Sequence, residues 1–148
     1  MSQKINTNKF LKNVRIGLWR IEVEEGKLPR FYADEVMDEL LGITEEITPE
    51  ERFAFHRRCV HPDDMEMFLE YSDKLTETQT EIVYRYIHPI SGEMFVRCAG
   101  IRDNSVTSGI SIIGTHQDIS ETIRVEKEKE AERRLSLIHI SEPTRPLY

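Results

Sequence analysis

The 148-residue sequence has only two cysteines and no long hydrophobic run. Cys59 and Cys98 are too few for the disulfide framework that holds small secreted domains together, so both are expected to be reduced thiols. No apolar stretch approaches the roughly 20 residues that a helix needs to cross a bilayer. Residues 1–8 also lack the apolar core of a signal peptide. These absences predict a cytoplasmic protein that makes no membrane contact.

Clustered positive charge is missing as well. The chain has 20 Lys and Arg against 27 Asp and Glu, which gives a net charge of −7 at pH 7. Nucleic acids and anionic membranes are bound through patches of Lys and Arg. The two adjacent arginine pairs, Arg57-Arg58 and Arg133-Arg134, each lie near acidic residues. Nucleic acid is therefore not expected as a partner.

The sequence also lacks a catalytic constellation. Its seven glycines are scattered and form no phosphate-binding loop, and no Ser-centred elbow is present. His56 and His61 are five residues apart, so they do not share a helix face as metal ligands at i and i+4 would. Neither catalysis nor a metal site is expected, and the chain is predicted not to be an enzyme.

What the sequence does contain is a run of three predicted β-strands. They are rich in β-branched and aromatic residues, which suit a half-buried pleated surface. Turn residues at positions 89–92 and 103–109 separate them. Neighbouring strands of this kind are expected to pair as antiparallel hairpins. The predicted strands are residues 81–88, 93–103 and 109–117.

A helix is predicted directly after the third of these strands. Asp118 followed by Glu121 three positions later is a variant of the capping box, in which a side-chain oxygen caps the helix and a glutamate reciprocates. Because so few residues separate strand and helix, a shift of the sheet is expected to move the helix. The predicted relay residues are Asp118, Ile119, Ser120, Glu121 and Ile123.

The N-terminal half predicts one further hairpin. Trp19, Ile21 and Val23 have the same parity, so in a strand over residues 15–22 they would share one face. A turn at residues 24–27 leads to a short strand at residues 30–32. Trp19 is expected to pack in the core.

Three helices are predicted between the hairpin and the three strands. The first, residues 34–41, has apolar residues at helical spacing and Gly42 after its end. Thr48-Pro49-Glu50-Glu51 is a strong start for the second, which is expected to end near Val60. His61-Pro62-Asp63-Asp64 is expected to open the third, with two acids on the positive end of its dipole.

In this order, these features resemble the PAS domain family over residues 15–121. Leu40-Leu41-Gly42 and His61-Pro62-Asp63-Asp64 match recurrent segments of the family, although Ile43 stands where an aromatic residue is usual. Asp118-Ile119-Ser120 stands in place of the family's Asp-Ile-Thr motif. The resemblance implies an α+β fold. It consists of a five-stranded antiparallel sheet with short helices on one face, and the last strand lies beside the first.

The resemblance further implies a sensory or regulatory role and a pocket between the helices and the inner face of the sheet. A flavin photosensor of the family needs an Asn-Cys-Arg-Phe-Leu-Gln-like segment, which residues 58–61 do not match. A haem sensor needs a histidine that faces the pocket, and His56, the one candidate, is expected to be partly exposed. Flavin and haem are therefore not expected, and Cys98 is expected to be a packed thiol. The residues predicted to line the pocket are Trp19, Ile21, Tyr84, Tyr86 and Ile112.

Four segments are predicted along the chain. Residues 1–14 form a polar segment, either a short helix at the edge of the domain or a frayed leader. Residues 15–119 form the PAS-like domain, and residues 120–134 form a charged helix. That helix is either a solvated surface helix or a signalling linker that starts a coiled coil, and the resemblance favours the linker.

The fourth segment, residues 135–148, has the alternation of a strand and resembles a translated sequencing adapter. It is expected to be non-native, so that the natural protein continues past about Arg134 into an output domain such as a histidine kinase or diguanylate cyclase. The alternative is a native tail that docks Leu137 and Ile138 on the domain, which would allow an independent metabolite-binding protein.

The expected partners are a small-molecule ligand and a second copy of the chain, bound through the sheet and the linker helix. A dimerisation or protein-interaction module without any ligand is the alternative.

Overall fold

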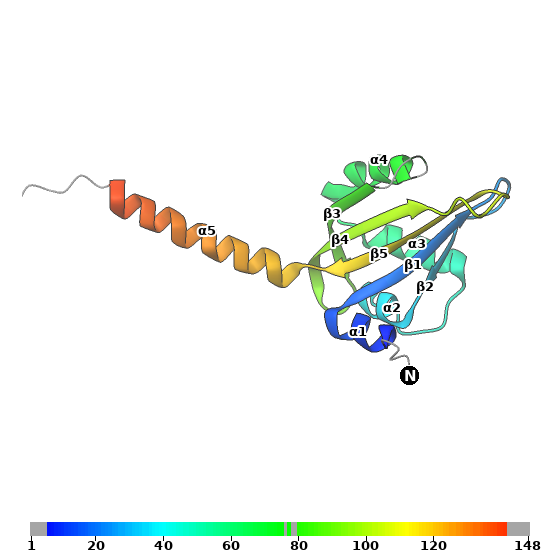
Figure 1. Ribbon diagram of the computed structural model, residues 1–148, viewed down its shortest axis with the longest axis horizontal. Helices are drawn as coiled ribbons and strands as arrows, with labels where there is room; N and C mark the ends of the chain where they lie inside the picture. The colour runs from blue at the N-terminus through cyan, green and yellow to red at the C-terminus, as the bar shows by residue number, and fades with distance from the viewer. Residues whose placement is uncertain (1–5, 76, 78–79, 142–148) are drawn as a thin grey trace, which may run out of the picture.

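The computed structural model describes residues 6–75, 77 and 80–141 of the chain, and its centre is one antiparallel sheet (Figure 1). The strand order is β2-β1-β5-β4-β3, so the last strand lies in the middle of the sheet, beside the first. The predicted α+β fold, five-stranded sheet and antiparallel hairpins are confirmed. The strands are β1 (Ile16–Val23), β2 (Arg30–Ala33), β3 (Thr80–His88), β4 (Gly92–Arg102) and β5 (Ile110–Asp118).

Short helices cover one face of this sheet, while the last helix projects away from it (Figure 1). The covering helices supply buried apolar residues that pack against the inward side chains of the strands. None of the described helices is both long and apolar enough to cross a bilayer. The helices are α1 (Thr7–Val14), α2 (Glu35–Leu41), α3 (Pro49–Cys59), the 3₁₀ turn η1 (Pro62–Asp64), α4 (Met65–Leu75) and α5 (Ser120–Ser141).

Most helices begin and end close to the residues that the capping pattern predicted. The Thr48 hydroxyl accepts a hydrogen bond from the Glu51 amide at 3.1 Å, and Gly42 ends α2 with a φ of +81°, a conformation that favours glycine. Asp64 differs from expectation. Its carboxylate was expected to act on the dipole of the helix start. It also accepts three hydrogen bonds, of 2.8 to 3.0 Å, from Arg85 on β3. It therefore ties the start of α4 to the sheet.

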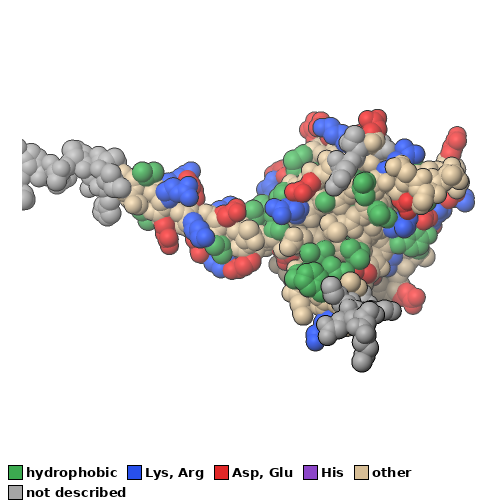
Figure 2. All heavy atoms as spheres, in the orientation of Figure 1, with side chains coloured by type: hydrophobic (Ala, Val, Ile, Leu, Met, Phe, Trp, Pro, Cys, Tyr) green, Lys and Arg blue, Asp and Glu red, His purple; other side chains and the backbone are tan. Residues whose placement is uncertain are grey.

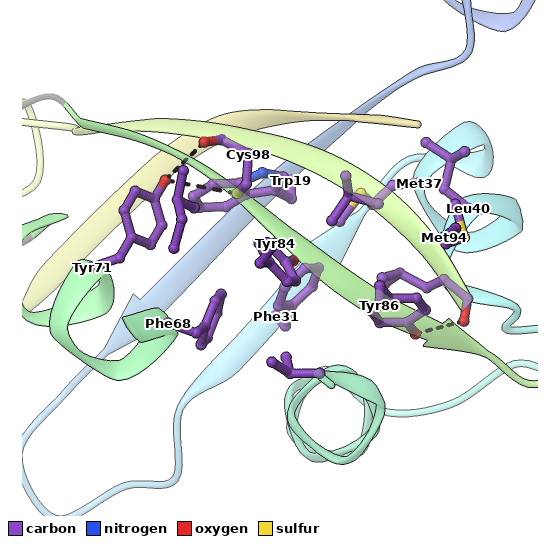
Figure 3. Packing of buried hydrophobic residues seen from close by; sticks show 14 of the residues in the cluster. Trp19, Phe31, Met37, Leu40, Phe68, Tyr71, Tyr84, Tyr86, Met94 and Cys98 are labelled. Atoms are coloured by element: carbon purple, nitrogen blue, oxygen red, sulfur yellow. Dashed lines mark hydrogen bonds between the residues drawn. The ribbon is translucent and has the colours of Figure 1, made fainter. Parts of the chain in front are cut away.

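Three tyrosine hydroxyls join the covering helices to the strands, and Figure 3 shows the bonds of two of them, Tyr71 and Tyr86. Tyr71 of α4 donates to the Cys98 carbonyl of β4 at 3.3 Å, and Tyr86 of β3 donates to the Leu41 carbonyl of α2 at 2.7 Å. Tyr84 of β3 lies 2.7 Å from Nε2 of His56 on α3. Because buried hydroxyls are costly without partners, these three bonds fix where each helix sits on the sheet.

Trp19 lies across two glycines of the sheet. It is directly opposite Gly114 on β5, which in turn is opposite Gly100 on β4. A Cβ atom at Gly114 would lie 2.3 Å from Cζ2 of Trp19 and 2.2 Å from the Ala99 carbonyl oxygen. The indole Nε1 donates to the Thr115 carbonyl at 3.0 Å. The two glycines thus create the space that this large ring occupies, and Trp19 is in the core as predicted.

Two expectations about the C-terminal helix were wrong. The capping box does not form, because Asp118 is still paired within β5, its Oδ1 accepts from the Ser120 amide at 2.9 Å, and Glu121 pairs with Arg124 instead. The helix also continues to Ser141, so residues 135–141 are helical rather than strand-like. Leu137 and Ile138 are each 56% exposed, so these side chains do not dock in the core. The rest of the adapter-like tail, residues 142–148, lies outside the described residues.

Candidate functional site

A small cavity lies between the helices and the inner face of the sheet. Its volume is about 30 Å³, which leaves space for about one water molecule. Of the predicted pocket residues, Trp19 and Ile21 line it, whereas Tyr84, Tyr86 and Ile112 are buried on the same face of the sheet without reaching it. Figure 3 shows Trp19, Tyr71 and Cys98 together at this end of the core.

His56 lies deep in this site, contrary to the expectation that it is partly exposed. Only 6% of the residue is exposed, and its ring stacks between those of Phe31 and Tyr86 at centroid distances of 5.6 and 5.8 Å. Burial, together with the nearby His116 and Arg57, holds the pKa of His56 well below its ordinary value. The ring is therefore neutral at pH 7 and hydrogen-bonds to the Tyr84 hydroxyl.

His116, like Arg57 and Tyr71, lines this site and was missed by the sequence reasoning. It lies on β5 with its side chain fully buried, and neither ring nitrogen has a hydrogen-bond partner among the described residues. Burial lowers its pKa to about 4. Strand parity would have found it, because His116 has the same parity as Ile112, which was correctly assigned to the inner face.

Two further groups complete the cavity wall. The Arg57 guanidinium lies over the rings of Phe53 and Phe68, 4.8 and 5.0 Å from their centroids. Burial raises the pKa of the Cys98 thiol to about 12, so Cys98 is the packed, unreactive thiol that the sequence predicted. Within the described part of the chain, no group of three His, Cys, Asp or Glu side chains could hold a metal ion.

The second part of the site is the junction between β5 and α5. Phe95 of β4 holds it through two hydrogen bonds of its own backbone: its carbonyl accepts from the Ile119 amide, and its amide donates to the Ser120 hydroxyl, both at 2.9 Å. Ile119, the one residue between strand and helix, is only 6% exposed. Lys127, two turns into α5, places its ammonium 5.0 Å from the Phe95 ring.

The structure brings together only some of the predicted relay residues. Asp118, Ile119 and Ser120 meet at the junction, and the Ile123 amide donates to the Ile119 carbonyl at 2.9 Å in the first turn of α5. Glu121 is exposed and pairs with Arg124 on the helix surface. Sequence reasoning missed Phe95, because its role depends on the register of β4 against β5.

Beyond the junction, α5 carries mainly exposed charges. Arg124 pairs with Glu121 and Glu128, and Glu130 pairs with Arg133 and Arg134 within the helix. Pairs at these spacings stabilise an exposed helix only weakly. These exposed pairs are consistent with a solvated surface helix, which was one of the two alternatives predicted from the sequence. The coiled coil stays a prediction.

A wider groove of about 660 Å³ lies on the opposite face of the sheet, formed by β1, β2, β4 and β5. Four of its apolar side chains are between 37% and 46% exposed; they are Leu18, Tyr32, Ile101 and Ile113. Figure 2 shows hydrophobic side chains gathered between α1 and the sheet in the same view as Figure 1. A contiguous apolar surface of this kind is typical of an interaction site.

Comparison with known proteins finds a match to one family and many similar structures. The family model for the PAS fold matches residues 30–109. A sensory box histidine kinase/response regulator from Burkholderia thailandensis is 18% identical, with 88% of this chain and 96% of that chain covered and a TM-score of 0.66. No curated protein is matched.

Two further solved structures are similar. The N-terminal domain of a diguanylate cyclase with a PAS/PAC sensor from Marinobacter aquaeolei is 24% identical, with 72% and 97% coverage and a TM-score of 0.55. An RNA-binding light-oxygen-voltage receptor is 16% identical, with 85% of this chain but 34% of that chain covered and a TM-score of 0.56. At these identities the likeness shows a common fold.

Proposed function

Because this chain belongs to the PAS fold family, we propose that it is the sensory or regulatory module of a bacterial-type signal-transduction protein. Two structural neighbours are sensory domains of a histidine kinase and a diguanylate cyclase, so the proposal includes an output domain of one of these types after about Arg134. It also includes a cytoplasmic location and a non-native tail from about Leu135. The module itself is not assigned a catalytic role.

The observation that carries the proposal is the junction at Phe95. β5 is a central strand, so contacts made on either face of the sheet act on it. The two hydrogen bonds from Phe95 then couple the position of β4 and β5 to the first turn of α5. A ligand or partner that favours one sheet geometry would shift the population of helix positions. A difference of about 1–3 kcal/mol between the states would regulate an output domain.

The relay predicts a specific effect of Asp118→Ala. The substitution removes the acceptor for the Ser120 amide and should cost about 1 kcal/mol of stability, as a lost helix cap does. In a chimaera that joins residues 1–134 to a histidine kinase core, autophosphorylation should change severalfold.

Thr122→Ala is the matched control, because Thr122 is exposed in the same turn of α5. It should leave the kinase rate as in the unmodified chimaera. If Asp118→Ala lowers stability but leaves kinase activity and its regulation unchanged, the relay is not carried by this junction.

The alternative function is a dimerisation or interaction module that binds no ligand. The apolar groove on the outer face of the sheet favours it, since the exposed side chains of Leu18 and Ile113 would be covered by a second copy. Concentration-dependent association in sedimentation experiments, with no small molecule bound in native mass spectrometry, would support this alternative over the ligand sensor.

A further inference from the structure

The internal cavity has an unusual charge balance for this chain. The whole sequence carries 27 acidic residues and a net charge of −7, yet none of the described residues that line the cavity is acidic. Its polar lining consists of a guanidinium, two imidazoles, two hydroxyls and a thiol, and the remaining lining is mainly aromatic. The polar lining residues are Arg57, His56, His116, Tyr71, Ser72 and Cys98.

Arg57 provides positive charge at the more open side of the cavity. The helices α3 and α4 supply partly exposed residues to the cavity wall, namely Phe53, Arg57 and Ser72. The other residues that these helices place on the wall near Arg57 are buried; they are His56, Phe68 and Tyr71. Among the described residues, Arg57 makes no salt bridge; it is held over the two phenyl rings instead. Burial lowers the pKa of Arg57, and the electrostatic effects of Tyr84 and Asp73 partly offset this. The guanidinium therefore has donors to offer to an incoming anion.

His116 provides hydrogen-bonding capacity at the back of the cavity. A neutral imidazole has one donor and one acceptor nitrogen, and both are unpartnered here although the ring is fully buried. An unsatisfied buried polar atom costs about as much as a lost hydrogen bond and calls for a partner. The cavity is the space that this partner would occupy.

We propose that this cavity is a binding site for a short-chain carboxylate, which names the ligand class of the sensory function proposed above and rests on it. The carboxylate oxygens accept hydrogen bonds from Arg57 and from a ring N–H of His116. The short alkyl end lies against the aromatic wall formed by Trp19 and Phe68. Arginine suits this ligand because its planar fork of donors matches a carboxylate.

Size and charge select this class over other anions. The cavity of about 30 Å³ favours a small ligand. A short carboxylate is larger than the one water that this space holds, so the partly exposed Phe53 has to shift outward while Arg57 stays on the ligand. A phosphate or sulfate would bring a second negative charge into an apolar site that offers a single fixed cation. A carboxylate brings one charge and an apolar end.

Binding can be measured on the whole chain with defined probes. Sodium formate, acetate, propionate and hexanoate are titrated by calorimetry in chloride buffer, and the fluorescence of Trp19, the only tryptophan, is followed in parallel. Saturable binding of acetate or propionate is expected, with weaker binding of hexanoate and none of acetamide, a neutral molecule of acetate's shape. No saturable binding of any carboxylate beyond the response to sodium chloride would overturn the proposal.

Two neighbouring arginines give a matched pair of variants. Arg57→Gln should weaken acetate or propionate binding at least about tenfold, as the loss of a charge-assisted hydrogen bond does. Arg58→Gln should bind as the unmodified chain does, because Arg58 is exposed on the same helix and does not line the cavity. Arg57→Lys keeps the charge without the fork, so it should lose less affinity than Arg57→Gln.

Equal affinity of Arg57→Gln and the unmodified chain would overturn the site, and thermal unfolding of each variant shows that the comparison is made on folded protein. The outcome is separable from the relay. If the chain binds a carboxylate but the kinase activity of the chimaera does not respond to any ligand, the binding site stands and the sensory function is contradicted. If the kinase activity is regulated but no carboxylate binds, the sensory function stands and the binding site is contradicted.

Discussion

Gly114→Ala is expected to destabilise the domain by about 3 kcal/mol or more, the upper end for atoms inserted into a packed core. The new Cβ would lie 2.2 Å from the Ala99 carbonyl oxygen and 2.3 Å from the Trp19 ring. The carbonyl belongs to the neighbouring strand of a central ladder, so it cannot move without disturbing the pairing of β4 and β5. Urea denaturation followed by circular dichroism measures the loss.

Two other glycines serve as controls for this substitution. Gly26 has a φ of +78° and no neighbouring atom within 4 Å of a new Cβ, so Gly26→Ala should cost only the left-handed backbone strain of about 1–2 kcal/mol. At Gly100 the nearest atoms are side-chain tips of Trp19 and Leu75, at 2.8 and 3.0 Å, which can shift, so an intermediate loss is expected. If Gly114→Ala were no more destabilising than Gly26→Ala, Trp19 would not lie against this glycine.

Acid is expected to destabilise the domain through His116 by about 3 kcal/mol. Its folded pKa of about 4 lies below the ordinary value of 6.5, so between these values the unfolded chain binds the proton and the folded chain does not. The contribution of neutral His116 to stability is thus complete above pH 6.5. It is lost as the pH falls toward 4, and buried His56 adds to the loss in the same direction.

His116→Phe separates this effect from other titrations. The variant keeps a ring in the core but cannot titrate, so its stability should fall less than that of the unmodified chain between pH 6.5 and about 4. Of the carboxylates whose pKa is lowered, Asp64 and Asp103 lose their contribution below their ordinary value of 3.8, and Glu24 and Glu121 below 4.5, equally in both proteins. Urea denaturation across this range, in buffers without carboxylates, gives the comparison. Equal pH dependence of the two proteins would contradict a buried neutral His116.

The fold could be predicted from the sequence because its boundaries are marked by local chemistry. The turns at residues 24–27 and 89–92 and the cap at Thr48 act over a few residues, so the strands and helices begin and end close to the predicted positions. The length of α5 was underestimated for a related reason. No helix-terminating residue occurs between Arg134 and Ser141, so the alternating apolar residues there simply extend an established helix.

The sites were less predictable because they depend on contacts distant in sequence. Strand parity placed Trp19 and Tyr84 on the inner face, and it would equally have placed His116. The burial of His56 could not be read from α3, whose inner face mixes aromatic and charged residues. The role of Phe95 follows from the pairing of Val96 with Asp118, which requires the register of β4 against β5.

Native-state hydrogen exchange of the Ile119 and Ile123 amides tests most directly whether β5 and α5 move as one unit. The amides donate to Phe95 of β4 and to Ile119, respectively. If the strand and the first turn of the helix are one unit, both amides should exchange with the same opening free energy as the amides of β5. Near-unprotected exchange of Ile119 and Ile123, while β5 remains protected, would show that the helix opens independently of the sheet and would contradict the relay.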